Sequence, residues 1–145
     1  MKVVVGCDHG GYEAKESLKA FLKEQNIDAI DVGTNSKDSC NYAQFGINAA
    51  EKVAAKEVDF GIVICSSGEG IAIAANKVKG IRCGIGYNDD VAALLRQHND
   101  ANMISFGAKF MTIDEIKKRS LIFLKTSFEG GRHCVRVDTI KNQEK

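Results

Sequence analysis

The sequence has no proline, and its first residues contain only a short apolar run. Without proline, no loop can rely on a fixed φ or a cis X–Pro bond, so glycine, asparagine and aspartate must shape the turns. The first residues, MKVVVGCDHGG, offer three valines before a glycine, which is too short for a signal peptide or a membrane-spanning helix. We therefore expect a cytoplasmic protein without a membrane partner.

Net charge is nearly absent as well, since 20 Lys and Arg residues face 19 Asp and Glu residues. A net charge of +1 gives no global basic field to attract nucleic acid, and no basic run marks a membrane surface. No C-x-x-C pair occurs among the cysteines, which are Cys7, Cys40, Cys65, Cys83 and Cys134. This pattern favours free thiols in a reducing compartment over a disulfide framework or a zinc site.

Apolar segments alternate with helical segments along the chain, without a repeat or a linker. The expected strands cover residues 3–7, 29–33, 60–65, 82–87 and 103–108. The expected helices cover residues 12–26, 42–57, 71–78, 89–99 and 112–128, with a short last helix from His133. Strands that are apolar almost throughout are typical of a parallel sheet covered on both faces. The sequence therefore predicts one α/β domain over residues 1–145, a three-layer α/β/α fold with a Rossmann-like five-stranded parallel sheet.

The stretch CSSGEG (65–70) follows one of these strands and precedes a helix. In parallel α/β sheets, ligands bind beyond the carboxyl ends of the strands, where chain direction reverses. The amides of this loop, with the positive end of the helix behind it, suit a phosphate or an enediolate oxygen. The helix end also favours a thiolate at Cys65, whereas buried cysteines often serve packing alone. Both roles stay open on the residue pattern.

Two further motifs carry polar side chains, each with a plain structural alternative. GCDHGG follows the first strand but is not the G-x-G-x-x-G nucleotide motif. Asp8 is able to accept from a sugar hydroxyl and His9 to contact phosphate, or Asp8 only caps the next helix. In RQHNDAN, His98 is a candidate acid/base and Asn99 an amide donor, or His98 only caps a helix end. Because that helix ends at the amino edge of the sheet, a catalytic His98 would serve a neighbouring subunit's site unless the turn bends.

The segment FEGGRHCVRV places Arg132 and Arg136 four residues apart on the expected last helix. This spacing puts both guanidinium groups on one face, where they are able to clamp a phosphate dianion. The alternative is a solvated basic face without a ligand. A base, an anion-binding loop, a ring-opening acid and a phosphate clamp together suit the isomerisation of a small phosphorylated sugar.

Four motifs, GCDHGGYEAK, GIVICSSGEGIAIAANK, RQHNDAN and EGGRHCVRV, resemble the ribose-5-phosphate isomerase B family in order and spacing. The resemblance covers nearly the whole chain, and the family also includes allose-6-phosphate and galactose-6-phosphate isomerases. It implies an aldose–ketose isomerase that needs no metal and no organic cofactor. It further implies a homodimer, with pairing into a tetramer left open, whose sites are shared between subunits.

The resemblance also implies roles for single residues. Cys65 would be the base that moves a proton between C1 and C2, with Ser67 as its hydroxyl neighbour, and His98 would be the ring-opening acid/base. The remaining residues would hold sugar oxygens, stabilise the enediolate through loop amides or surround the phosphate. With Ser67, the expected substrate-binding residues are Asp8, His9, Tyr42, Ser66, Gly68, Glu69, Gly70, Asn99, Lys109, Arg132 and Arg136.

The sequence departs from the family pattern at several of these positions. Ser66 replaces a usual glycine, so a left-handed backbone there would cost about 1 kcal/mol of strain. Glu69 adds a carboxylate beside the anion-binding loop. Asn41 replaces a usual aspartate, and Lys109 replaces a common arginine, which leaves a point charge instead of a planar fork.

Other functions stay open beside the pentose-phosphate isomerase. One is an isomerase for a six-carbon sugar phosphate, above all allose 6-phosphate. Another is a sugar-phosphate-binding regulator that has lost turnover, which the departures at Ser66, Glu69 and Asn41 motivate. A cysteine hydrolase would need a histidine oriented against Cys65 and an acyl substrate, which the phosphate clamp disfavours. Family branches without this cysteine place a glutamate base at the position of Ile71, so Cys65 keeps the role here.

Overall fold

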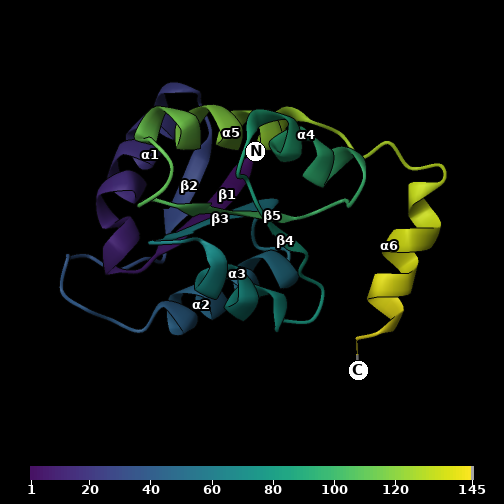
Figure 1. Cartoon of the computed structure of the whole chain (residues 1–145), viewed down its shortest axis with the longest axis horizontal. Helices are drawn as coiled ribbons and strands as arrows, with labels where there is room; N and C mark the ends of the chain where they lie inside the picture. The colour runs from purple at the N-terminus through teal and green to yellow at the C-terminus, as the bar shows by residue number, and fades with distance from the viewer. Residues whose placement is uncertain (145) are drawn as a thin grey trace.

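A five-stranded parallel sheet forms the centre of the computed structural model, which describes residues 1–144 (Figure 1). The strands are β1 (Lys2–Cys7), β2 (Asp28–Asp31), β3 (Phe60–Cys65), β4 (Cys83–Ile85) and β5 (Met103–Gly107). The α-helices are α1 (Tyr12–Glu24), α2 (Tyr42–Ala54), α3 (Glu69–Asn76), α4 (Asp89–Gln97), α5 (Ile113–Lys125) and α6 (His133–Asn142), and a 3-10 turn, η1 (His9–Gly11), precedes α1. The predicted three-layer α/β/α fold is confirmed.

The strands are arranged in the order β2-β1-β3-β5-β4. After β1 the chain adds β2 on one side of β1 and then places β3 on the other side. All strands stay parallel, but the direction in which new strands are added to the sheet reverses at β1. The register of this pair sets Cys7 opposite Ile64. The loops that follow β1 and β3 therefore leave the same edge of the sheet side by side, at the position where open α/β sheets bind ligands.

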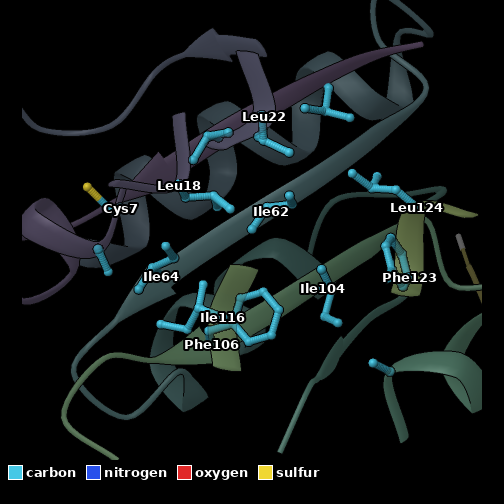
Figure 2. Close-up of a cluster of buried hydrophobic side chains, with 14 of the residues drawn as sticks. Cys7, Leu18, Leu22, Ile62, Ile64, Ile104, Phe106, Ile116, Phe123 and Leu124 are labelled. Atoms are coloured by element: carbon cyan, nitrogen blue, oxygen red, sulfur yellow. The ribbon is translucent and has the colours of Figure 1, made fainter. Parts of the chain in front are cut away.

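Helices α1, α4 and α5 cover one face of the sheet, and α2 and α3 cover the other (Figure 1). Because successive strand residues point to opposite faces, each strand feeds both cores. Figure 2 shows the first core, in which Leu18 and Leu22 of α1 and Phe123 of α5 pack against Ile62 and Ile104 of the strands. Burial of each such side chain contributes about 1.5–3 kcal/mol. Cys65 belongs to the other core, beneath α2 and α3.

Several helix ends follow from side-chain caps that the sequence carries. Thr112 and Glu115 form the expected capping box at the start of α5, and Asn88 accepts from Val91 N at the start of α4. Helices α1 and α2 end earlier than predicted, because the chain turns through positive φ at Asn26 (60°) and Lys56 (59°). The prediction of element type was correct, and the predicted ends were wrong by a few residues.

Helix α6 lies beside the three layers rather than within one of them (Figure 1). Its first residue, His133, and Val137 are buried, whereas Val135 is 71% exposed and Ile140 is 49% exposed. The amide of Glu129, just before α6, donates to the carbonyl of Gln97 at the end of α4. Residues 1–144 contain no helix with the length and apolarity needed to cross a membrane.

Candidate active site in two halves

Cys65 is the last residue of β3 and lies at the carboxyl-terminal end of the sheet, where the loops after β1 and β3 leave the sheet next to each other. The residue is only 5% exposed, and its Sγ accepts a hydrogen bond from the amide of Gly68 at 3.1 Å. A backbone N–H aimed at sulfur stabilises negative charge on it, as does the nearby amino end of α3. The position therefore suits a thiolate that removes a proton.

The loop after Cys65 has a fixed backbone. Gly68 adopts a left-handed conformation (φ 82°), and a Cβ there would lie 2.8 Å from the carbonyl carbon of Phe106, so only glycine fits. The hydroxyl of Ser105 on β5 donates to the carbonyl of Gly68 at 2.6 Å, and the hydroxyl of Ser67 accepts from the amide of Glu69 at 3.1 Å. These bonds hold the Gly68 amide against the sulfur of Cys65.

The same loop presents free backbone donors. Within residues 1–144, the amides of Ser66, Ser67 and Gly70 have no acceptor in the protein. Such N–H groups at the amino end of a helix form an anion-binding concavity. The loop is thus able to stabilise an oxyanion next to Cys65.

Asp8 and His9 follow β1 and lie against this loop. Asp8 is 6% exposed, and its Oδ1 accepts from the amides of Gly10 at 2.9 Å and Gly11 at 3.2 Å, so the helix-cap alternative is realised. A Cβ on Gly10 would collide with the hydroxyl of Ser66, which shows how closely the two loops pack. The Nδ1 of His9 accepts from the amide of Cys40 at 3.2 Å, which leaves Nε2 as a donor.

Two more expected residues complete this group. Tyr42 begins α2 after the Asn41 cap, and its ring lies so close to Gly70 that a Cβ there would collide with it. The amide of Lys109 donates to the carbonyl of Ser66 at 3.0 Å. We call this group the Cys65 half-site; it consists of Asp8, His9, Tyr42, Cys65, Ser66, Ser67, Gly68, Glu69, Gly70 and Lys109.

The other expected residues meet elsewhere, where the end of α4 faces α6. A cavity of about 360 Å³ lies between them, and we call its lining the His98 half-site. The lining consists of His98, Asn99, Arg132, His133, Arg136, Val137 and Ile140. The Nη1 of Arg136 donates to the carbonyl of Arg132 at 2.6 Å, which sets the two arginines on the same side of α6.

His98 is held by contacts with residues just before and at the start of α6. Its ring stacks on the ring of His133, with centroids 4.2 Å apart and planes inclined by 16°. Glu129 Oε1 lies 3.7 Å from Nε2 of His98 and 3.5 Å from Nε2 of His133. Burial lowers the pKa of His133, as do the neighbouring charges of His98 and Arg132. His133 therefore stays neutral to a lower pH than an exposed histidine.

Two arginines fix the turn that carries His98 and Asn99. Arg82 donates through Nε to the carbonyl of Asn99 at 3.0 Å and through Nη2 to the carbonyl of Asp100 at 2.6 Å. The buried Arg96 donates to a side-chain oxygen of Asp100 at 2.9 Å and to the carbonyl of Ala101 at 2.6 Å. Asp100 has φ 45°, so these bonds support a left-handed residue at the tip of the turn.

The two half-sites lie at opposite ends of the sheet. Cys65 pairs with Gly107 at the carboxyl ends of β3 and β5, whereas the His98 turn leads into Met103, which pairs with Gly61. Four residue steps along a strand separate these ends, which is about 13 Å at 3.3 Å per residue. The chain therefore assembles each half-site but does not bring the two together.

The departures from the family pattern cause little distortion. Ser66 is not among the residues with positive φ; Gly68 carries that conformation, so the strain considered for Ser66 does not arise. Glu69 is exposed in the first turn of α3, where a carboxylate complements the helix dipole. Asn41 uses its side-chain oxygen to cap α2, and Ile71 is fully buried.

The other cysteines differ from Cys65 in their surroundings. Burial raises the pKa of Cys7 to about 12 in spite of the nearby Lys15 ammonium, and burial raises the pKa of Cys83 to about 12 as well. These two thiols therefore serve as packing groups. Cys134 is exposed, and Cys40 places its Sγ 3.8 Å from Nδ1 of His9.

Sequence reasoning missed several residues that support the site. Ser105 is a fully buried hydroxyl within an otherwise apolar strand, which is the one signal that marked it. Glu129 and His133 stand next to the arginine pair in FEGGRH, but their contact with His98 depends on where α6 packs. Arg82 and Arg96 bond to backbone carbonyls, which no spacing rule reveals.

Comparison with known proteins finds a matching family and similar chains. Residues 3–140 match the family model described as Ribose/Galactose Isomerase. The ribose-5-phosphate isomerase B of Escherichia coli is 41% identical over 96% of this chain and 93% of its own length. The ribose-5-phosphate isomerase B of Mycobacterium leprae is 37% identical over 100% of this chain and 91% of its own length.

Solved structures show the same fold. The ribose-5-phosphate isomerase B of Clostridium thermocellum superposes with a TM-score of 0.97 at 43% identity, covering 99% of this chain and 97% of its own. The enzyme of Mycoplasma genitalium, solved with bound ribulose 5-phosphate, superposes with a TM-score of 0.93 at 36% identity, covering 98% of this chain and 95% of its own.

Proposed function

Because the chain belongs to the ribose/galactose isomerase family, we propose that it is an aldose–ketose isomerase that interconverts ribose 5-phosphate and ribulose 5-phosphate. The observation that carries this proposal is the position of Cys65 at the reversal point of the sheet. There an amide points at its sulfur, and free loop amides stand beside it. These are the parts that proton transfer through an enediolate requires.

In this proposal the thiolate of Cys65 removes the proton from C2 of the open-chain aldose. The electron pair of that C–H bond forms the C1=C2 double bond, and the carbonyl oxygen at C1 becomes an oxyanion. The amides of Ser66, Ser67 and Gly70 stabilise the developing negative charge. The O2 hydroxyl then passes its proton to the O1 oxyanion. The thiol returns its proton to C1 as the C1=C2 double bond shifts and the C2–O2 bond becomes the ketose carbonyl. No step needs a metal ion or an organic cofactor.

His98 acts before this step by opening the sugar ring. It takes the proton of the C1 hydroxyl and delivers a proton to the ring oxygen as the bond between C1 and that oxygen breaks. His98 lies at the amino-terminal end of the sheet, opposite to the end that carries Cys65 of the same chain. We therefore propose a homodimer in which His98 of the partner subunit reaches the Cys65 half-site, and the exposed Val135 and Ile140 of α6 supply apolar contact area.

The substrate is held at both ends. Arg132 and Arg136 of the partner subunit clamp the phosphate, and Lys109 and the Nε2 donor of His9 approach it from the Cys65 half-site. Asp8 and Asn99 bind sugar hydroxyls, and the ring of Tyr42 lines the pocket. All five cysteines are free thiols, which fits a protein of the reducing cytoplasm.

The direct test is an assay of the purified protein with ribose 5-phosphate and with allose 6-phosphate, detecting the ketose in the presence and absence of EDTA. We expect turnover of ribose 5-phosphate that EDTA leaves unchanged, and slower turnover of the six-carbon sugar. Preference for allose 6-phosphate would assign the hexose substrate instead. Binding of both sugars without turnover would indicate a regulator, and activity lost to EDTA and restored by a metal would contradict the mechanism.

A further inference from the structure

Three potential metal ligands converge where the end of α4 meets the start of α6, and two of them, His98 and His133, line the cavity there. One ring nitrogen of His98, one ring nitrogen of His133 and a carboxylate oxygen of Glu129 all lie within 4.8 Å of one another. Glu129 Oε1 is 3.7 Å from the first nitrogen and 3.5 Å from the second. Ring-opening chemistry needs His98 but does not require a second imidazole and a carboxylate around the same point.

The two distances from Glu129 to the histidine nitrogens are close to those that a metal ion demands, whereas the two ring nitrogens, within 4.8 Å of each other, must approach further. Ligands 2.0–2.1 Å from a tetrahedral ion stand about 3.3 Å apart, so both distances to Glu129 need to shrink by only a few tenths of an ångström. The two rings are nearly parallel, so one must rotate about its χ2 bond to direct its lone pair at the ion. This torsion is broad for histidine, and the half-exposed Glu129 side chain is free to adjust.

The chemistry of the ligands and the local charge select the kind of ion. Two imidazoles and one carboxylate are the donor set of zinc sites that keep a fourth position open. Mg²⁺ and Ca²⁺ prefer oxygen ligands and are disfavoured here. Arg132 and Arg136 line the same cavity and repel a cation, while Glu129 attracts it. An ion that bonds strongly to neutral imidazole is therefore favoured over one held by charge alone.

We propose that His98, Glu129 and His133 form a Zn²⁺ site, and that its occupancy reversibly inhibits the isomerase. The inhibitory part rests on the proposed role of His98. Zinc bound to His98 occupies the lone pair that accepts the proton during ring opening, and the ion stands beside the cavity that His98, His133 and the two arginines line. The metal is thus an inhibitor, which agrees with a catalytic cycle that needs none.

Binding is tested first, without any assay of turnover. Metal-stripped protein is titrated with Zn²⁺ in a calorimeter and with Co²⁺ in a spectrophotometer, as wild type and as the variants Glu129→Gln and His133→Gln. Cys134→Ser is the control, because this exposed thiol neighbours His133. We expect one ion per chain in wild type and control, and affinity at least about tenfold weaker in the other two variants. Unchanged affinity in both, or a thiolate-to-cobalt charge-transfer band, would overturn the site.

Inhibition is then measured against the metal-free activity of each variant. Zn²⁺ should inhibit wild type and Cys134→Ser, EDTA should reverse the inhibition, and His133→Gln and Glu129→Gln should need at least about tenfold more zinc. Binding without inhibition would remove the inhibitory role. A metal-free wild type that fails to turn over ribose 5-phosphate would instead contradict the proposed function, so the two failures are distinguishable.

Discussion

The Cys65 half-site and the His98 half-site are built in different ways. Around Cys65, the groups that would act on the sugar carbons and hydroxyls are backbone amides and two buried side chains, with Cys65 5% and Asp8 6% exposed, whereas His9, Tyr42 and Lys109 at the rim are more exposed. Around His98, they are long or half-exposed side chains on a turn and on α6, and the side chain of His98 is 38% exposed. One chain supplies every residue of the Cys65 half-site. The His98 half-site faces outward and lies far from Cys65 of the same chain.

This difference has a physical reason. Stabilising a carbanion-like intermediate needs donors fixed before the reaction, and backbone N–H groups at a sheet edge are the most rigid donors available. Binding a phosphate needs charge, which is costly to bury without a partner. Groups of the second kind remain at the surface until a second subunit covers them.

Loss of Cys65 should have the largest effect on chemistry. Cys65→Ala should lower kcat by about 10²–10⁴-fold while substrate still binds, because a positioned base contributes about that much. Glu69→Gln is the matched control from the same loop, and it should change kcat less than about tenfold because that carboxylate is exposed in the first turn of α3. Steady-state kinetics and substrate titration of both variants check this. Near-normal turnover by Cys65→Ala with an inactive Glu69→Gln would move the base to Glu69.

Substitutions in the His98 half-site should weaken substrate binding. Arg132→Ala and Arg136→Ala should each raise KM by roughly 10–100-fold, since a charge-assisted contact to phosphate contributes about 1.5–3 kcal/mol. Unphosphorylated ribose should be a very poor substrate for the wild type. Equal kcat/KM for ribose and ribose 5-phosphate would remove the clamp and, with it, the contrast between the two halves.

The stability of the protein near the Cys65 half-site should also depend on a buried ion pair. Lys15 is fully buried and donates to Asp31 at 2.9 Å and to the carbonyl of Thr34 at 2.6 Å, close to the end of β1. Burial raises the pKa of Asp31, but hydrogen bonds from Lys15 and Lys19 outweigh burial and hold the pKa below its ordinary value of 3.8. The carboxylate therefore contributes stability that is fully present above that value and is lost as the pH falls through the lower pKa of the folded protein.

Asp31→Asn should accordingly destabilise the protein at pH 7 by up to about 3 kcal/mol, because it leaves the buried ammonium of Lys15 without its nearest carboxylate. The difference from wild type should narrow only below about pH 4. Denaturant unfolding of both proteins between pH 3 and pH 7 measures this difference in the free energy of unfolding. A difference that narrows above pH 5 would show that Asp31 is not the group involved.

The support of the anion-binding loop should give the smallest effect. Ser105→Ala leaves the carbonyl of Gly68 without its buried donor, so we expect a loss of about 1–3 kcal/mol in unfolding free energy and a modest fall in kcat. Ser120→Ala is the matched control, since the buried hydroxyl of Ser120 has no hydrogen-bond partner in residues 1–144. Equal losses in both variants would mean that the bond to Gly68 does not hold the loop.

Much of the Cys65 half-site could be predicted from the sequence. Apolar strands of five or six residues fixed the positions of Asp8 and Cys65 at strand ends, and the parallel-sheet rule placed those ends together. The strand order could not be predicted, because the apolar runs of β3 and β5 are equally suited to a central position. The helix ends at Glu24 and Ala54 were missed by two and three residues, because the residues that follow them still suit a helix and the left-handed turns at Asn26 and Lys56 carry no glycine to mark them.

Less of the His98 half-site could be predicted from physical rules alone. The arginine pair follows from helical spacing, but the stacking of His98 on His133 depends on where α6 packs beside α4. That packing involves few apolar residues and leaves no periodic signal in the sequence. The same is true of Arg82 and Arg96, whose partners are backbone carbonyls of the turn.

The most direct test of two complementary halves is activity in heterodimers of defined composition. Differently tagged Cys65→Ala and His98→Ala chains are co-expressed and purified through both tags, and turnover of ribose 5-phosphate is measured. If His98 serves the partner's Cys65, one of the two sites is intact, and activity should reach about half that of the wild type. Pairing a Cys65→Ala, His98→Ala double variant with a wild-type chain should then leave both sites damaged. An inactive first heterodimer with a half-active second one would place the whole site within one chain and contradict the account.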